Sequence, residues 1–130
     1  MDIQEFKLGN LIKICPRENE EGVLFITDIQ PTSIIGEMLT PRQGYHFRIK
    51  FDEILPLELS EEWLQKLGFT KKQNEEDIWT DLKNFIHFKL SAFENGFIEE
   101  GKIAVSINSV HQLQNTYFTL TGEVLSVVKT

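Results

Sequence analysis

The stretch VHQLQNTYFTLTG, residues 110–122, has the spacing of an amphipathic helix, yet it contains no Asp, Glu, Lys or Arg. At about 100° per residue its main apolar side chains share one face, with Phe118 at the margin: Val110, Leu113, Tyr117 and Leu120. The polar side chains lie opposite: Gln112, Asn115, Thr116 and Thr119. Asn108 or Ser109 can cap this helix, and Gly122 can end it. An exposed polar face usually carries Lys and Glu, so this uncharged face predicts partial burial, first against the rest of the chain and second against a partner.

Composition and charge set the broad class of the protein. The chain has 130 residues, of which 41% are hydrophobic and 25% charged, and we expect residues 1–130 to form one globular domain. Cys15 is the single cysteine, and we expect a protein of a reducing cytoplasm, without membrane contact. Because 13 Lys and Arg face 20 Asp and Glu, the formal charge of −7 should repel nucleic acid and anionic membranes and can favour a basic protein partner.

Residues 1–57 predict short strands. Runs of strand-forming residues occupy 8–14, 22–29, 45–51 and 53–57, separated by segments rich in Pro, Gly and polar residues. The clearest run is YHFRIKF, residues 45–51, where apolar and basic side chains alternate with the two-residue period of a half-buried strand. We therefore expect a small SH3-like or curled antiparallel β-barrel in this first half.

Residues 58–130 predict a helix, a meander and a second helix. Ser60 can cap a short helix that Gly68 ends, and strand patterns follow at 77–82, 84–90 and 102–107. The dipeptide Asn95-Gly96 favours a tight turn between the last two of these strands. The fold class is therefore α+β, with an antiparallel meander and a C-terminal helix that covers a sheet.

Three segments together resemble a known group of proteins. They are Leu8-Gly9-Asn10, LSEEWLQKLGF at residues 59–69, and VHQLQNTYFTLTGEVL at residues 110–125. The chain is similar over nearly its whole length to small uncharacterised proteins of Bacteroidota genomes, phages and mobile elements. The resemblance implies an accessory protein in a phage or mobile-element setting, and it implies no activity.

Catalytic and metal-binding patterns are absent from the sequence. It contains none of the usual nucleophile-elbow, zincin, phosphate-loop or dinucleotide motifs. The histidines fall on separate predicted elements, and Cys15 reads as a small buried hydrophobe at the end of a strand. His111 and Asn115, one helical turn apart, could transfer protons, but the polar margin of a packed helix is the simpler explanation. We expect no cofactor, no metal and no small-molecule substrate, and we rank an enzyme last.

Two charged features are candidate binding sites. The basic stripe, which consists of Arg42, His46, Arg48 and Lys50, could hold a single-stranded nucleic acid on one face of a sheet, or it could be the solvated face of a strand. Acidic residues gather at Glu61 and Glu62 and again at Glu75, Glu76 and Asp77. If these clusters converge in space, they could imitate a phosphate backbone. Acidic clusters of this kind usually belong to solvated loops.

The leading functional hypothesis is a stoichiometric protein inhibitor of a host defence system. The best guess is an anti-CRISPR protein that binds an effector nuclease, either a type VI RNA-guided RNase or a type II DNA nuclease, with or without its guide RNA. The contact residues would come from the uncharged helix face and from the acidic clusters. The alternative is a small accessory protein that binds single-stranded nucleic acid through the basic stripe on strand 45–51.

Overall fold

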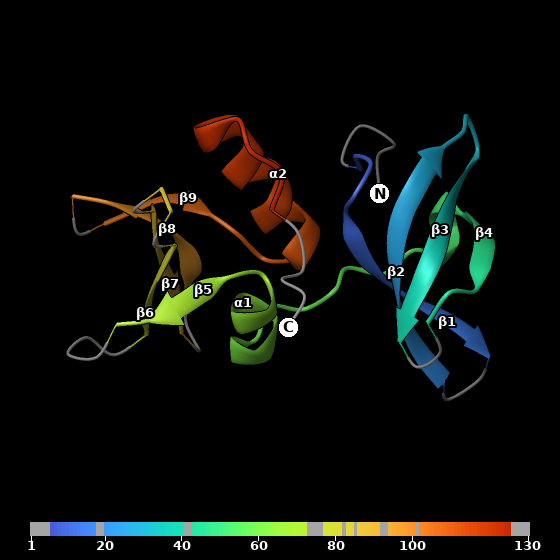
Figure 1. Ribbon diagram of the computed structural model, residues 1–130, viewed down its shortest axis with the longest axis horizontal. Coiled ribbons are helices and arrows are strands. Elements are labelled where there is room, and N and C mark those ends of the chain that lie inside the picture. Colours follow the sequence, from blue (N-terminus) through green and yellow to red (C-terminus); the bar gives the residue numbers. More distant parts are fainter. Residues whose placement is uncertain are drawn as a thin grey trace.

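The computed structural model is an α+β protein in which two antiparallel sheets lie on either side of two helices (Figure 1). The structure describes residues 6–17, 20–40, 43–72, 77–81, 83–84, 86–91, 94–100 and 102–125. The expected fold class is therefore confirmed. Within these residues, no helix has the length and apolar character needed to cross a membrane.

The first sheet is open. Its four strands lie in sequence order: β1 (Leu11–Arg17), β2 (Glu20–Ile29), β3 (Ser33–Thr40) and β4 (His46–Lys50). A 3-10 turn, η2 (Phe51–Glu53), follows β4 and leads the chain back to the far edge of the sheet. There Lys13 and Leu55 exchange backbone hydrogen bonds of 3.0 and 2.9 Å. Because β1 and β4 do not pair with each other, the sheet does not close into a barrel.

Strand β3 is an element that the sequence patterns did not predict. Its Gly36 lies against β2, where an added Cβ would come within 2.5 Å of the Leu24 Cγ atom. The glycine thus makes room for the Leu24 side chain, and it does not mark a loop. The predicted strand at 53–57 is reduced in the structure to η2 and the single bridge at Leu55.

The second sheet is a meander, as expected. Its strands lie in the order in which they occur: β5 (Phe69–Lys71), β6 (Ile78–Asp81), β7 (Ile86–Leu90), β8 (Asn95–Glu99) and β9 (Lys102–Ser106). The predicted Asn95-Gly96 turn is wrong, because both residues begin β8. The turn comes earlier, and the Asn95 side chain accepts a 2.9 Å hydrogen bond from the backbone N–H of Ser91.

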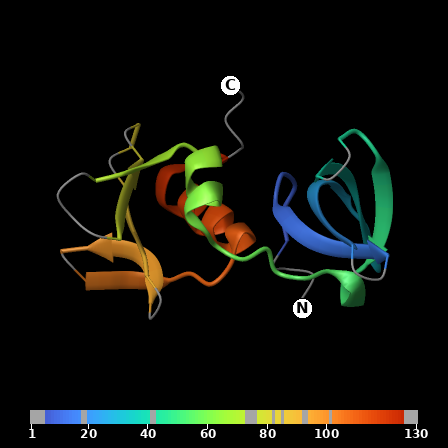
Figure 2. The ribbon, with the colours of Figure 1, turned by 90° about the horizontal axis from the view of Figure 1, so that it is seen from below.

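Both helices begin and end where their capping residues predict. Helix α1 (Glu61–Lys66) begins after Ser60, whose hydroxyl accepts a hydrogen bond from the Trp63 N–H. Helix α2 (Val110–Thr121) begins after Ser109 in the same way and ends at Gly122, which adopts the left-handed conformation with φ 76°. The two views place both helices between the sheets (Figure 1, Figure 2).

Two hydrophobic cores share strands β1 and β2. The first core lies within the first half and contains Phe6, Ile12, Ile14, Leu24, Ile26, Ile34, Met38, Ile49 and Ile54. On the opposite face of the same strands, Leu11 and Val23 belong to the second core. The second core also contains Leu57, Leu64, Leu67, Phe69, Trp79, Phe88, Phe97, Ile107, Val110, Leu113, Tyr117 and Leu125. Strands β1 and β2 are thus packed on both faces, which joins the two halves.

The position of α2 between the halves explains why residues 110–122 carry no charge. Five of its side chains are buried: Val110, His111, Leu113, Gln114 and Tyr117. The buried side of α2 is therefore wider than the predicted apolar face, because it also includes the polar residues His111 and Gln114. Of the predicted polar face itself, Gln112, Asn115 and Thr116 are half-buried and Thr119 is exposed, so partial burial within the chain is found for three of its four residues.

Two side chains that the sequence predicted to be buried are exposed in the structure. Leu120, expected on the buried face of α2, is 51% exposed near the helix end. Cys15, expected to be buried, is exposed: it points to the same face of β1 as Leu11, and the second core buries that face at Leu11 but not at Cys15.

Candidate functional site

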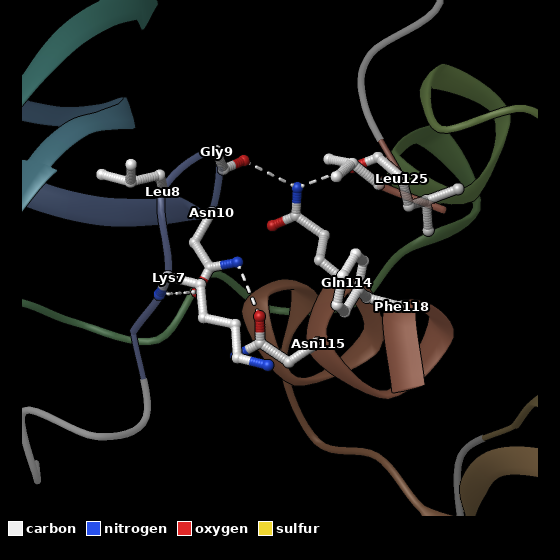
Figure 3. A pocket seen from close by; sticks show the side chains of 9 residues that line it. Lys7, Leu8, Gly9, Asn10, Gln114, Asn115, Phe118 and Leu125 are labelled. Carbon is white, nitrogen blue, oxygen red and sulfur yellow. Dashed lines mark hydrogen bonds between the residues drawn. The ribbon is translucent and has the colours of Figure 1, made fainter. Parts of the chain in front are cut away.

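The candidate site lies at the junction of the two halves, where Gln114 of α2 meets the start of β1 and the segment after α2 (Figure 3). The side-chain oxygen of Gln114 accepts a 2.8 Å hydrogen bond from the backbone N–H of Leu11. Its amide nitrogen donates 3.0 Å hydrogen bonds to the carbonyl oxygens of Gly9 and Leu125. Both donors and the acceptor of this buried amide are used, so the side chain fixes three backbone segments together.

A turn before β1 forms the neighbouring wall of the site. The Asn10 side chain accepts a 2.9 Å hydrogen bond from the Lys7 N–H and donates one of 2.9 Å to the Asn115 side-chain oxygen. Gly9 has φ +89°, a conformation that side chains disfavour, which explains the glycine in the Leu8-Gly9-Asn10 segment. Two segments that are far apart in the sequence and that carry the resemblance are thus joined directly here.

Around this junction lies a pocket of about 250 Å³, hereafter the seam pocket. It is lined by Lys7, Leu8, Gly9, Asn10, Gln114, Asn115, Phe118, Val124 and Leu125. Three large apolar side chains of the lining are exposed: Leu8 by 62%, Phe118 by 43% and Val124 by 66%. The Lys7 ammonium lies 5.4 Å from the centroid of the Phe118 ring. The pocket thus combines an apolar wall, a row of amides and one positive charge.

On the opposite side, α2 is held to the second sheet by Tyr117. Its hydroxyl donates a short hydrogen bond to the buried Asp81 carboxylate and accepts one of 2.7 Å from the Asn84 side chain. Burial, followed by the hydrogen bond to Asp81, raises the pKa of Tyr117 to about 12. These contacts explain the position of α2 against the second sheet.

One exposed ion pair lies beside this contact. The Lys83 ammonium and the Glu123 carboxylate are 2.8 Å apart. Their hydrogen bond raises the pKa of Lys83 and lowers the pKa of Glu123. Both groups therefore stay charged at neutral pH.

The predicted contact face of α2 is only partly available to a partner. Gln112 is half-buried and accepts a 2.8 Å hydrogen bond from the Asn108 N–H, so it supports the helix start. Thr116 is half-buried, and the exposed Thr119 donates to the Asn115 carbonyl oxygen at 3.1 Å. Asn115 alone among the four predicted residues lines the seam pocket.

The sequence reasoning missed the apolar members of the pocket. Leu8, Phe118 and Val124 are isolated apolar residues in a turn, at a helix margin and beyond a helix end. The available signal was Phe118, which lies off the apolar face of α2 and therefore had no assigned partner in the core. The pairing of these positions depends on the meeting of residues 7–10 with α2, which no local pattern predicts.

The acidic candidates among the described residues, Glu61, Glu62 and Asp77, are all exposed. Glu61 and Glu62 are exposed on the first turn of α1, where they pair with Lys71 at 3.6 Å and Lys66 at 3.0 Å. Asp77 is exposed and has a positive φ of 65° before β6. Glu75 and Glu76 lie outside the described residues.

The basic stripe is exposed on β4. His46, Arg48 and Lys50 project from the outer face of this strand, while Ile49 is buried, as the alternation predicted. In the register, Glu37 and Ile35 of β3 lie opposite His46 and Arg48. No ion pair within the described part of the chain involves these three basic side chains. Arg42 lies outside the described residues.

The described residues contain no group of three His, Cys, Asp or Glu side chains placed to hold a metal ion. His111 is buried, with the Ser109 hydroxyl 3.2 Å from its Nδ1 and the Phe6 ring centroid at 5.1 Å. No protein family, curated protein or solved structure matches the chain in comparisons with known proteins. The resemblance to Bacteroidota and phage proteins therefore stays a prediction.

Proposed function

We propose that the protein is an accessory factor of a phage or mobile element that binds a host defence protein stoichiometrically. The observation that carries this proposal is the seam pocket, whose exposed apolar side chains Leu8, Phe118 and Val124 come from separate segments and gather at one place. Apolar side chains that cluster on a surface and are surrounded by polar groups are typical of protein interfaces.

The partner that we favour is a CRISPR effector nuclease, either a type VI RNA-guided RNase or a type II DNA nuclease. Two considerations support this class. The resemblance implies a mobile-element setting, and the formal charge of −7 favours association with a protein that has a basic nucleic-acid channel. The protein would act in the bacterial cytoplasm by occupying such a surface, without turnover of a substrate.

The test is affinity capture from a Bacteroidota host that carries active CRISPR systems, with and without RNase. We expect wild-type protein to recover one effector in near-equal amount, and the Phe118→Asp variant to lose at least about tenfold of the binding, since central aromatic contacts dominate interfaces. Sensitivity to RNase would indicate that guide RNA is part of the contact.

Leu120→Asp is the matched control, because Leu120 lies on the same helix and is exposed but does not line the seam pocket. Thermal unfolding followed by circular dichroism checks that both variants remain folded. Capture of no effector from matched hosts, or equal capture by both variants, would contradict the proposal.

A second candidate function rests on the basic stripe. His46, Arg48 and Lys50 are all exposed on one strand next to the exposed Tyr45, which is the combination that single-stranded nucleic acid binding requires. Here the Arg48→Glu/Lys50→Glu double variant should weaken binding of a fluorescent oligonucleotide and reduce its salt dependence. The Lys71→Glu/Lys102→Glu variant makes the same charge change on the second sheet and should have less effect.

We further propose that the first half is an open relative of an SH3-like barrel. The 3-10 turn η2 after β4 and the bridge between Lys13 and Leu55 support this description, since they bring the end of the half back to its first strand. An experimental structure in which residues 53–57 pair with β1 over several residues would support the barrel, whereas a single bridge there would leave an open sheet.

A further inference from the structure

The seam pocket holds a positive charge that no described carboxylate neutralises. Lys7 forms no ion pair with the described residues, whereas the nearby Lys83 is paired with Glu123. The Lys7 ammonium instead lies over the Phe118 ring, 5.4 Å from its centroid. In a protein with a formal charge of −7, an unpaired ammonium at the edge of an apolar wall is a local exception.

The polar groups of the same pocket are largely used within the protein. Gln114 makes three hydrogen bonds to the backbone, and Asn10 bonds both Lys7 and Asn115. An occupant therefore meets mainly the apolar surfaces of Leu8, Phe118 and Val124 and the ammonium of Lys7. The volume of about 250 Å³ is below the roughly 300–1,000 Å³ of typical small-molecule sites, and it suits one inserted side chain.

We infer that the seam pocket binds a segment of a protein partner in which an apolar side chain stands next to an acidic one. The apolar side chain packs on Phe118, and the neighbouring carboxylate pairs with the Lys7 ammonium. Adjacent residues are about 3.8 Å apart along the chain, so both groups reach their positions from one short segment. This inference rests on the proposed protein-binding function and names the chemistry of the contact.

The probes are two capped tetrapeptides that differ in one charge, Ala-Phe-Asp-Ala and its Asn counterpart. Binding is followed by the amide chemical shifts of Gly9, Phe118 and Val124 in two-dimensional NMR of the full chain. We expect the acidic peptide to bind about two- to fivefold more tightly, which is the range of an exposed ion pair, and this preference to vanish in molar salt.

Three variants separate the two contacts. Lys7→Gln should remove the preference for the acidic peptide, so that the variant binds the acidic and the neutral peptide with equal affinity. Phe118→Ala should weaken both peptides, whereas Leu120→Ala, outside the pocket on the same helix, should weaken neither. Equal binding of the two peptides to wild type, or an unchanged preference in Lys7→Gln, would overturn the inference.

The outcomes distinguish this inference from the proposed function. If no host protein is captured but the charge preference depends on Lys7, the contact chemistry stands and the effector assignment fails. If an effector is captured with equal affinity by wild type and Lys7→Gln, the function stands and the inference is wrong.

Discussion

The two halves of the molecule differ in what completes their hydrophobic cores. Every member of the first core, from Phe6 to Ile54, comes from the first half. The second core includes Leu11 and Val23, which come from the outer face of the first sheet. The second half therefore takes part of its core from the first sheet, whereas the first core draws all its apolar members from the first half and meets α2 at the ring contact between Phe6 and His111.

The attachment of α2 shows the same asymmetry in chemical terms. Toward the first half it is held by the neutral amide of Gln114, and toward the second sheet by the phenol of Tyr117, which can lose a proton. The comparison teaches that one helix can join two sheets through contacts that respond differently to pH. Four changes test this asymmetry.

The largest effect is expected from Phe88→Ala in the second core. Phe88 is fully buried, with the Phe97 ring centroid at 5.2 Å, and its truncation should lower the free energy of unfolding by about 3–5 kcal/mol. Urea unfolding combined with amide hydrogen exchange measures this loss. If the two halves unfold as one cooperative unit, the amide exchange rates of β1 and β2 rise together with those of β6 to β8. If the amides of the first sheet stay protected, the halves unfold as two separate units.

The next effect is expected from Gln114→Leu at the junction. Leucine strands the N–H of Leu11 and the carbonyl oxygens of Gly9 and Leu125. The bonds to Leu11 and Leu125 are buried and the bond to Gly9 is part-buried, so at the lower end of about 1–3 kcal/mol per stranded group the free energy of unfolding should fall by about 2–3 kcal/mol. Gln112→Leu on the same helix is the control and should cost less, because within the described part of the chain its side chain accepts one hydrogen bond, from the Asn108 N–H four residues earlier. Similar losses in both variants would argue against a junction held by Gln114.

High pH should weaken the second attachment of α2. The pKa of Tyr117 is about 12 in the folded protein against 10.0 ordinarily, so the unfolded chain loses the proton first as the pH rises. The contribution of the protonated Tyr117 to the free energy of unfolding is complete below pH 10 and is lost as the pH rises toward 12. At 1.36 kcal/mol per pKa unit, this contribution amounts to about 2–3 kcal/mol.

Urea unfolding is measured at a series of pH values for wild type and for Tyr117→Phe. The difference between the two proteins separates the effect of Tyr117 on stability from that of the lysines, which titrate in the same pH range. The stability difference should narrow as the pH rises from 10 to 12. Tryptophan fluorescence follows the second half specifically, because Trp63 and Trp79 both lie there. A constant difference between the two proteins would contradict a raised pKa for Tyr117.

The smallest effect compares one glycine in each sheet. A Cβ at Gly96 would lie 2.3 Å from the Val105 carbonyl oxygen, whereas at Gly36 the nearest atom is Leu24 Cγ at 2.5 Å. Both alanine variants should lose about 1–3 kcal/mol through overpacking. Gly96→Ala should lose more, because its Cβ would lie 2.3 Å from a backbone oxygen, whereas the nearest backbone atom at Gly36, the Phe25 carbonyl oxygen, is at 2.7 Å. Thermal unfolding would rank the pair. The opposite order would mean that the second sheet adjusts more easily.

Local patterns predicted those elements whose causes are local. The caps at Ser60 and Ser109, the end at Gly122 and the alternation in 45–51 each depend on residues within one or two turns or one strand. The failures have long-range causes. Gly36 was taken as a loop signal because the packing of Leu24 over it could not be seen, and Asn95-Gly96 was taken as a turn although the close approach of Val105 requires the glycine within a strand.

Neighbours along the chain were enough to predict the α+β class, the meander and both helix starts, because capping and periodicity act over a few residues. Only the tertiary structure decided that β1 and β2 serve two cores, that Gln114 joins three backbone segments, and that Leu8, Phe118 and Val124 meet at one pocket. The hydrogen bonds from Asn10 to Asn115 and from Gln114 to Gly9, for example, each join residues 105 positions apart. Contacts of this kind depend on how the whole chain packs, so no local pattern predicts them.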